Sequence, residues 1–272
     1  MGKLVYKSLK ICQVAPNKFK MVKKFSKHIE LRFYGGLNHF LPASKRQVPF
    51  YLPYMGTPTV KDLIESVGVP HVEVFLIVAD SISVGFDYKP EPSSQISCYP
   101  RFYNLSIDYG ILRPTEPAPP VFILDVHLGR LASYLRLYGF DTLYSNCYSD
   151  DQILRLAAAE NRIILTRDKG ILRSGAAIHG YYVRSTQPKE QLNEVVDYFS
   201  MACFADPFSR CSLCNGLVET VDRENVKGLV AENSYNHYHS FYRCSRCGQI
   251  YWEGSQYKGI LNLFGRHGPH HE

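Results

Sequence analysis

The chain has 272 residues, of which 45% are hydrophobic and 21% are charged. These fractions are ordinary for a globular protein and exclude a largely disordered or fibrous chain. No apolar run approaches the ~20 residues that cross a membrane. The first 28 residues also lack the continuous apolar core of a signal peptide. We therefore expect a cytoplasmic protein with no membrane association.

The net charge of +6 is concentrated near the N-terminus. Residues 1–30 contain eight lysines and one acidic residue, Glu30, and so carry +7, whereas the remainder carries −1. We expect residues 1–27 to form a disordered basic arm. This arm is either a soluble tail or a contact for nucleic acid or an anionic surface.

Residues 28–113 are rich in predicted strands. These strands are Ile29–Phe33, Val48–Leu52, Val72–Val78 and Ile82–Phe86. Thr59 and Asp62 form a capping-box pattern, which predicts a helix that ends at Gly68. The order strand, strand, helix, strand, strand predicts a β-grasp (α+β) domain. Residues 114–120 contain four prolines and predict a stiff extended linker.

In residues 121–206 the hydrophobic residues follow a different pattern from that of residues 28–113, with buried strands alternating with helices. The predicted strands are Val121–Leu124, Asp141–Tyr144, Ile163–Leu165 and Tyr181–Val183. The predicted helices are Leu128–Tyr138, a helix from Ser149 or Asp150 to Asn161, and Leu192–Met201. Alternating strands and helices indicate a doubly wound α/β domain with a mostly parallel sheet.

Acidic residues follow the strands of this predicted sheet. Asp125 comes directly after the first strand, Asp168 comes shortly after the third, and Asp150 and Asp151 begin the helix between them. Because carboxyl ends of parallel strands gather at one edge, we expect these carboxylates to converge. Clustered carboxylates favour a Mg²⁺ or Mn²⁺ ion that activates water for phosphodiester hydrolysis. Taken alone, Asp150 is explained as a helix N-cap and Asp168 as the cap of the short turn after its strand. Asp125 is harder to explain in this way, because an acid that ends a buried strand gains little structurally.

Basic residues surround these acids. Arg130 and Arg136 lie on the first helix of the α/β region, and Arg167 and Lys169 flank Asp168. They are candidates for contacts with RNA phosphates. The alternative is ordinary surface charge with local salt bridges.

Two Cys-x-x-Cys pairs follow in residues 207–264. Cys211, Cys214, Cys244 and Cys247 supply four thiolates, which suit a tetrahedral structural Zn²⁺. A redox Cys-x-x-Cys motif is the alternative, but two pairs without a thioredoxin-like context favour zinc. We expect a zinc ribbon here, followed by a tail over residues 265–272.

Four sequence blocks resemble one known family. They are Asp125–Ala132, Leu135–Asp141, Ser149–Leu154 and Ile163–Asp168. This order resembles the PIN-like ribonuclease family named after the C-terminal domain of the mutator-seven exonuclease (the Mut7-C type). That family often has an N-terminal ubiquitin-like domain and ends in a zinc ribbon. The resemblance implies a metal-dependent endoribonuclease site with Asp125, Asp150 and Asp168 as its acids, and with Asp151 where relatives often have Glu.

Two functions remain open from the sequence. The acid set favours a metal-dependent ribonuclease. A weak or inactive adaptor that binds RNA or the ribosome, or another protein through the β-grasp domain, is the alternative. Lys169 and Gly170 stand where a fourth acid is expected, and Gln256 stands where relatives have His, which favours the adaptor.

Overall fold

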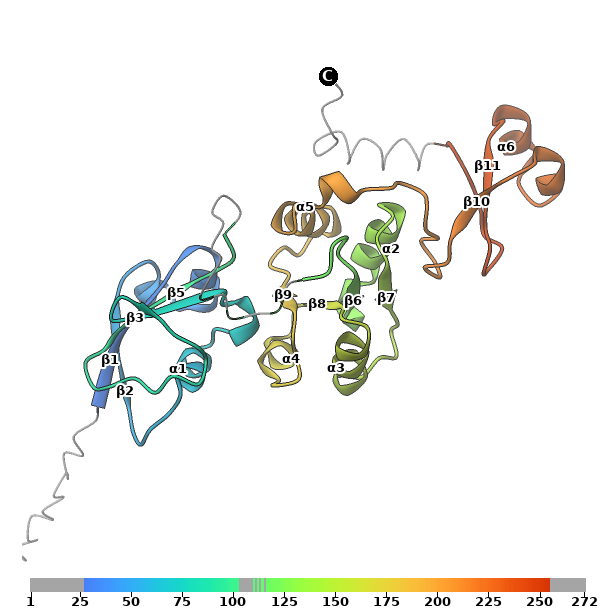
Figure 1. Cartoon of the computed structure of the whole chain (residues 1–272). Helices are drawn as coiled ribbons and strands as arrows, with labels where there is room; N and C mark the ends of the chain where they lie inside the picture. The colour runs from blue at the N-terminus through green and yellow to red at the C-terminus, as the bar shows by residue number, and fades with distance from the viewer. Residues whose placement is uncertain (1–26, 103–109, 111, 113, 115, 255–272) are drawn as a thin grey trace, which may run out of the picture.

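A computed structural model describes residues 27–102, 110, 112, 114 and 116–254. Three β-sheets follow one another along the chain (Figure 1). Residues 1–26 of the predicted arm, Gln256, the end of the predicted ribbon and the tail lie outside the described residues. Lys27, which we expected to end the arm, is the first residue of strand β1 (Lys27–Phe33). Within the described ranges, no helix combines the length and the apolar character that crossing a membrane requires.

The N-terminal sheet has the strand order β2–β1–β5–β3–β4. The strands beyond β1 are β2 (Phe50–Tyr54), β3 (Leu76–Ala79), β4 (Ile82–Ser83) and β5 (Gln95–Tyr99). Strand β1 pairs antiparallel with β2 and parallel with β5, so it lies inside the sheet. The alternation predicted for Ile29–Phe33 is confirmed, because Ile29, Leu31 and Phe33 are buried.

Helix α1 (Val60–Ser66) begins as the sequence predicts. The Thr59 amide donates to Asp62 Oδ2 at 2.9 Å, and the Asp62 amide donates to Thr59 Oγ1 at 3.2 Å, so the capping box is complete. Two residues after the helix, Gly68 has φ +103°, a conformation that favours glycine.

The predicted strand Val72–Val78 is only partly a strand. His71–Glu73 forms a 3-10 helix, η3, and β3 begins at Leu76. The reason is tertiary, because Val72 is buried in the same cluster as Ile123 of the central sheet. The segment therefore turns away from its own sheet toward the neighbouring domain. Two further 3-10 helices, η1 (Gly35–Phe40) and η2 (Ala43–Lys45), connect β1 to β2.

Strand β5 was absent from the sequence prediction. Its buried residues, Ile96 and Cys98, alternate with more exposed ones, so the period-two signal was present. It is the central strand of the N-terminal sheet, between β1 and β3.

The central sheet is parallel throughout and has the order β7–β6–β8–β9. Its strands are β6 (Phe122–Leu124), β7 (Thr142–Tyr144), β8 (Ile163–Thr166) and β9 (Gly180–Tyr182). All residues of β6 and β8 are buried, as the continuous apolar runs predicted. The chain runs from β6 outward to β7 and then crosses back to β8, so the order reverses between β6 and β8.

Helices cover both faces of the central sheet (Figure 1). One face packs against α2 (Gly129–Leu137) and α5 (Pro188–Tyr198), and the other against α3 (Asp150–Ala159) and α4 (Lys169–Arg173). Short 3-10 helices precede α2 (η4, Val126–Leu128) and follow α5 (η5, Met201–Phe204). The α/β prediction is confirmed, although α4 was not predicted and α5 starts and ends earlier than expected.

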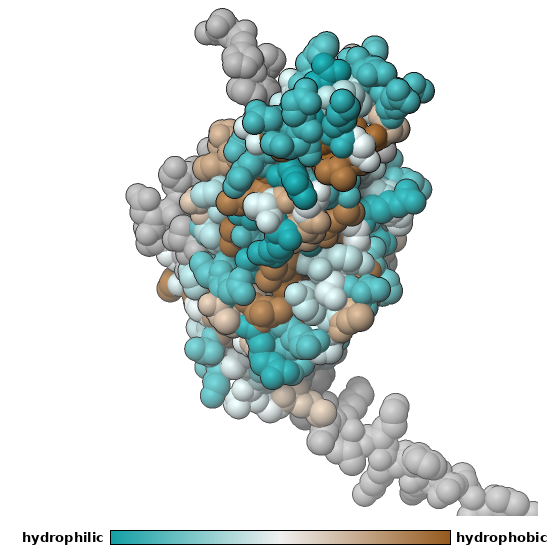
Figure 2. Space-filling view, turned by 90° about the vertical axis from the view of Figure 1, so that its right-hand side faces the viewer, coloured by the Kyte–Doolittle hydropathy of each residue, from teal (hydrophilic) through white to brown (hydrophobic). Residues whose placement is uncertain are grey.

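The C-terminal sheet is antiparallel and contains β10 (Val218–Val221), β11 (Phe241–Cys244) and β12 (Ile250–Trp252). The connection from β10 to β11 contains η6 (Arg223–Val226) and α6 (Glu232–His237). Figure 2 shows mostly hydrophilic residues at the top of this side of the molecule, with hydrophobic residues interspersed below them.

Candidate functional site

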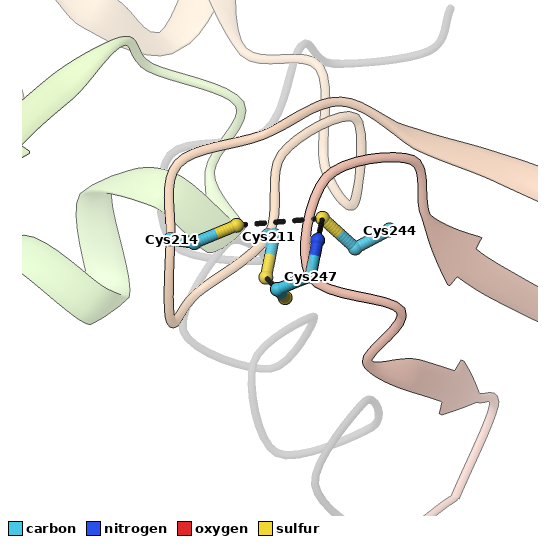
Figure 3. A group of neighbouring side chains, drawn as sticks. All are labelled: Cys211, Cys214, Cys244 and Cys247. Atoms are coloured by element: carbon cyan, nitrogen blue, oxygen red, sulfur yellow. Dashed lines mark hydrogen bonds between the residues drawn. The ribbon is translucent and has the colours of Figure 1, made fainter.

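Four cysteine sulfurs lie together at the base of the C-terminal sheet (Figure 3). Cys211 and Cys214 precede β10, Cys244 ends β11, and Cys247 lies in the turn that follows. The four Sγ atoms all lie within 4.8 Å of one another. Cys211 and Cys247 are separated by 3.6 Å, and Cys214 and Cys244 by 3.4 Å. Tetrahedral zinc with Zn–S bonds of about 2.3 Å places its sulfurs about 3.8 Å apart, so the four cysteines fit a structural zinc ion.

Backbone amides act on two of these sulfurs. The amides of Arg246 and Cys247 donate to Cys244 Sγ at 3.4 and 3.5 Å. Burial opposes ionisation of Cys244, but these hydrogen bonds outweigh it and lower the pKa of the thiol to about 7. A hydrogen bond from the Gln249 amide favours the Cys247 thiolate. Burial and the other three cysteines have a larger effect and raise the pKa of Cys247 to about 12. Four thiolates at neutral pH therefore require a cation among them.

Tyr251, on β12, supports the cysteine site from outside. Its hydroxyl lies 3.0 Å from Cys211 Sγ and accepts a hydrogen bond from the Ser212 amide at 3.1 Å. Burial, together with the Cys211 sulfur, raises the pKa of the Tyr251 hydroxyl. The hydroxyl keeps its proton and is placed to donate to a thiolate, as outer groups at metal sites commonly do.

Arg136, on α2, fixes the first cysteine pair to the central domain. Its Nη1 donates to the carbonyl oxygens of Ser212 and Leu213 at 3.2 and 2.8 Å, and its Nε donates to Thr142 O at 2.9 Å. The residue is 5% exposed. Arg136 is therefore not available to RNA, and the prediction that it contacts RNA phosphates is corrected.

A partly buried polar network centred on Asp141 continues this attachment. Its Oδ1 accepts hydrogen bonds from Arg162 Nη1 at 2.7 Å and from Asn215 Nδ2 at 2.9 Å, and Arg210 lies 3.4 Å from its Oδ2. Asn215 in turn accepts from the Thr142 amide at 3.1 Å. The first cysteine pair is thus joined to strand β7 by hydrogen bonds, of which those to the Asp141 carboxylate are charge-assisted.

Asp125 lies at the carboxyl end of β6, at the point where the strand order reverses. It is 3% exposed. Its Oδ1 accepts from the His127 amide at 2.8 Å, and its Oδ2 accepts from the Arg167 amide at 3.0 Å and from the Thr166 hydroxyl. A carboxylate has about four lone-pair sites, so three donors leave about one, on Oδ1, for a ligand. The edge at a strand reversal is also where ligands bind in such sheets.

Asp168 is linked to Asp125 through Thr166. The Thr166 hydroxyl donates to Asp125 and accepts from the Asp168 amide at 2.8 Å. The Asp168 carboxylate is exposed and caps α4, accepting from the Gly170 amide at 2.6 Å. Both acids therefore have capping roles, which the sequence suggested for Asp168 but not for Asp125, and both lie at the same sheet edge.

The acids of α3 are placed differently. Ser149, not Asp150, is the N-cap of α3, and it forms a capping box with Gln152. Asp150 is exposed in the first turn, and Asp151 pairs with Arg155 at the surface. Among the residues that the structure describes, the four cysteines form the only group of three or more candidate ligands within 4.8 Å. The expected convergence of three carboxylates is therefore not preassembled.

The remaining predicted RNA contacts differ in accessibility. Arg130 is exposed on α2. Arg167 is committed to the protein, since its Nη1 donates to three backbone carbonyls. The Lys169 ammonium lies 5.3 Å from the ring centre of Phe40 and 5.7 Å from that of Tyr182. Arg130 is thus the exposed candidate, and half-buried Lys169 remains a second because, within the described residues, no hydrogen bond to the backbone holds it as Arg167 is held.

Residues 120–264 match the protein family described as the Mut7-C RNAse domain, and this match covers more than half of the chain. The chain belongs to the Mut7-C RNAse domain family. Residues 26–106 match a second family, described as Mut7-C ubiquitin. No match is found among curated proteins or among solved structures. The family resemblance seen in the sequence blocks is confirmed, with a ubiquitin-like domain ahead of the Mut7-C domain.

Sequence reasoning missed several residues that organise the Mut7-C domain. Thr166 stands between two candidate acids, and its position at a strand end was the available signal. In the sequence, Asp141 only begins a predicted strand and ends one of the four sequence blocks. Its role depends on Asn215, a partner 74 residues away, which no local pattern indicates.

Proposed function

We propose that the chain is a metal-dependent ribonuclease that hydrolyses RNA phosphodiesters at the carboxyl edge of a PIN-like central sheet. The observation that carries the proposal is Asp125, a buried carboxylate at the strand reversal with room for one ligand. Membership of the Mut7-C RNAse domain family supports it.

The donors at this edge suit a hard divalent cation. Mg²⁺ is commonly held by one or two carboxylates together with substrate phosphates and water, and Mn²⁺ favours similar oxygen ligands. Asp125 and Asp168 follow neighbouring strands, so these two would hold the ion, with exposed Asp150 and Asp151 as further candidates. A bound ion supplies an activated water and neutralises charge on the phosphodiester.

Side chains and backbone amides of the chain orient the Asp125 carboxylate and bind the RNA phosphates. The Thr166 hydroxyl and the amides of His127 and Arg167 hold the Asp125 carboxylate in one orientation before substrate arrives. Arg130 and Lys169 offer positive charge for phosphate contacts. The cysteine site has four protein ligands and no open position, so we assign it a structural role.

One observation favours the second candidate function, an RNA- or ribosome-binding adaptor with weak or no catalysis. The acids do not form a three-residue ligand group within the described residues, and Asp151 is paired with Arg155. An adaptor needs only the basic residues and the zinc-supported fold.

RNA cleavage by the full chain tests the proposal. Zinc-loaded protein is mixed with structured and single-stranded RNAs, with Mg²⁺, with Mn²⁺ or with no added divalent ion. A strong chelator is avoided because it would also remove zinc from the cysteines. Cleavage that requires the added ion, and is lost in both Asp125→Asn and Asp168→Asn, is the expected result.

Asp222→Asn is the matched control, because Asp222 is exposed near β10. It should cleave like the wild type. If the wild type binds RNA but cuts none of the substrates with any ion, the adaptor replaces the ribonuclease. If both variants cut normally, the active site lies elsewhere.

A further inference from the structure

One carboxylate of the ubiquitin-like domain reaches into the Mut7-C domain. The side chain of Glu73, in η3, is 1% exposed. Its Oε1 accepts from the Tyr182 amide at 2.5 Å, and its Oε2 accepts from Nη2 of Arg184 at 3.0 Å. Tyr182 ends β9, the outer strand of the central sheet, and Arg184 follows it. A single side chain thus joins one domain to the strand end of the other.

The Arg184 side chain, which is 18% exposed, contacts residues of both domains. It lies over the ring of Phe40, from η1, at 5.6 Å and over the ring of Tyr181, from β9, at 4.8 Å. Burial disfavours its charged form, but Glu73, together with Tyr181 and Glu194, outweighs burial and raises the pKa of Arg184. The guanidinium therefore stays charged, with Glu73 as its nearer carboxylate partner and Glu194 at 3.8 Å as its second.

Side chains fix the backbone of residues 183–185 from two directions. Nη1 of Arg167 donates to the carbonyl oxygens of Val183, Arg184 and Ser185 at 3.0, 2.8 and 2.6 Å. The Glu194 carboxylate accepts from the amides of Arg184 and Ser185, each at 2.8 Å. Any movement of this segment would move the anchor of the Arg167 side chain.

The Arg167 amide completes the connection, because it donates to Asp125 Oδ2 at 3.0 Å. We propose that Arg184 and Arg167 are positioning residues, through which Glu73 of the ubiquitin-like domain fixes the carboxylate of Asp125. Only the catalytic consequence of this inference rests on the proposed ribonuclease function. The ubiquitin-like domain is then part of the site and not only a recruiting module.

The physical reason is the cost of removing the nearer of two carboxylates that pair with a largely buried charge. Without the Glu73 charge, the Arg184 guanidinium keeps only its longer contact to Glu194, at 3.8 Å, and the segment relaxes to expose it further to water. The carbonyl oxygens that hold the Arg167 side chain move with residues 183–185. The backbone amide of Arg167 then loses its hydrogen bond to Asp125. A second contact also joins the two domains near the candidate site. Lys169, next to Asp168, packs over Phe40 of the ubiquitin-like domain.

Glu73→Gln in the full chain tests the connection, with Glu160→Gln as the matched control. Glu160 also accepts a hydrogen bond from a buried arginine, Arg162, at 2.7 Å, but it lies outside the chain of contacts to Asp125. Residue-resolved hydrogen exchange by NMR should show the Arg167 amide exchanging about ten-fold faster in Glu73→Gln alone. Titration with Mn²⁺ alone should show binding weakened by about ten-fold, as for other outer-shell changes.

RNA cleavage adds a third readout. We expect kcat to fall about ten-fold in Glu73→Gln while KM stays within about two-fold, since no substrate contact is removed. If Glu73→Gln does not fold, Arg167→Lys, which keeps the charge but loses the planar fork, is read by the same exchange and Mn²⁺ measurements.

The outcomes test the positioning role of Arg184 and Arg167 separately from the ribonuclease function. A folded Glu73→Gln variant with unchanged Arg167 exchange and unchanged Mn²⁺ binding overturns the positioning role, whatever happens to RNA. If the wild type does not cleave RNA but the variant shows faster exchange and weaker Mn²⁺ binding, the positioning role stands and the ribonuclease function fails. Equal effects in Glu160→Gln would also overturn it, because the effect would then be general loosening.

Discussion

Nη1 of Arg136 lies 2.8 Å from the carbonyl oxygen of Leu213, in the first cysteine knuckle. The same guanidinium reaches Thr142 on β7 through Nε, at 2.9 Å. One buried cation therefore holds a helix, a strand and the cysteine module together. The cysteine module is attached to the central α/β region at its candidate metal-binding end, so we expect zinc binding and this interface to stabilise each other.

Replacing Arg136 by Met should lower the free energy of unfolding by about 3 kcal/mol, because one buried and two partly buried carbonyl groups lose a charged donor. Urea unfolding of zinc-loaded protein measures the change. Arg130→Met, on the exposed side of the same helix, is the control and should stay within about 0.5 kcal/mol of the wild type. Equal stability of the two variants would show that the Arg136 contacts contribute nothing.

Asp141 makes the stability of the same interface depend on pH. Burial favours its neutral form, but hydrogen bonds from Arg162 and Asn215, and the charge of Arg210, outweigh burial and lower its pKa. Its stabilising contribution is therefore complete above the pKa of the unfolded chain, about 4, and is lost as the pH falls through the lower folded value.

Asp141→Asn should accordingly be less stable than the wild type by about 2 kcal/mol at pH 7, allowing for the partial exposure of the side chain. The difference in free energy of unfolding should shrink below about pH 4. Urea unfolding at several pH values checks this, with the exposed Asp222→Asn variant as the control. A difference that stays constant down to pH 3 would contradict the assignment.

The cysteine site should hold one zinc ion per chain, and removing it should unfold the C-terminal sheet while the central sheet stays protected. Zinc content by native mass spectrometry and hydrogen exchange along the chain measure both effects. Zinc affinity should fall on acidification, because Cys247, with a pKa raised to about 12, must lose its proton to bind. Cys211→Ser should lose zinc, whereas Cys147→Ser, at an exposed cysteine outside the site, should retain it.

Neutralising Arg130 and Lys169 should weaken RNA binding without changing the zinc content. Removing one contact between a basic side chain and a phosphate should reduce the slope of log affinity against log salt by about 0.7 for single-stranded RNA. Fluorescence anisotropy at several salt concentrations, with Arg130→Gln, Lys169→Gln and the exposed control Lys227→Gln, tests this. Unchanged slopes in both variants would place the RNA elsewhere on the chain.

Local patterns in the sequence predicted the parts of the fold that local interactions determine. The Thr59 capping box, the buried runs of β6 and β8 and the two Cys-x-x-Cys pairs all appear in the structure as expected. Elements that depend on contacts between distant segments could not be predicted in this way. The 3-10 helix η3 stands where a strand was predicted, because Val72 packs against the neighbouring domain. Helix α4 was missed for another reason, since its five residues are too few to show a helical period.

The residues of the candidate site also fall into those that local sequence patterns predict and those that depend on distant contacts. The strand-end positions of Asp125 and Asp168 were predictable from where the apolar runs stop. The position of Asp150 was not, because Ser149 takes the cap and leaves Asp150 exposed in the first turn of α3. Nor could the sequence distinguish exposed Arg130 from buried Arg136, six residues later on the same helix, since that depends on where the ribbon packs.

The two outer strands of the central sheet are both closed by side chains of the flanking domains. Asn215 accepts the Thr142 amide of β7, and Glu73 accepts the Tyr182 amide of β9. Unpaired edge strands are templates for aggregation and for strand exchange between molecules. In the central sheet, each edge has one outward amide that such a side chain satisfies, which makes the edge a poorer template for self-association. Removing either the ubiquitin-like domain or the cysteine module would free one of these amides, so the central sheet depends on both of its neighbours to limit self-association.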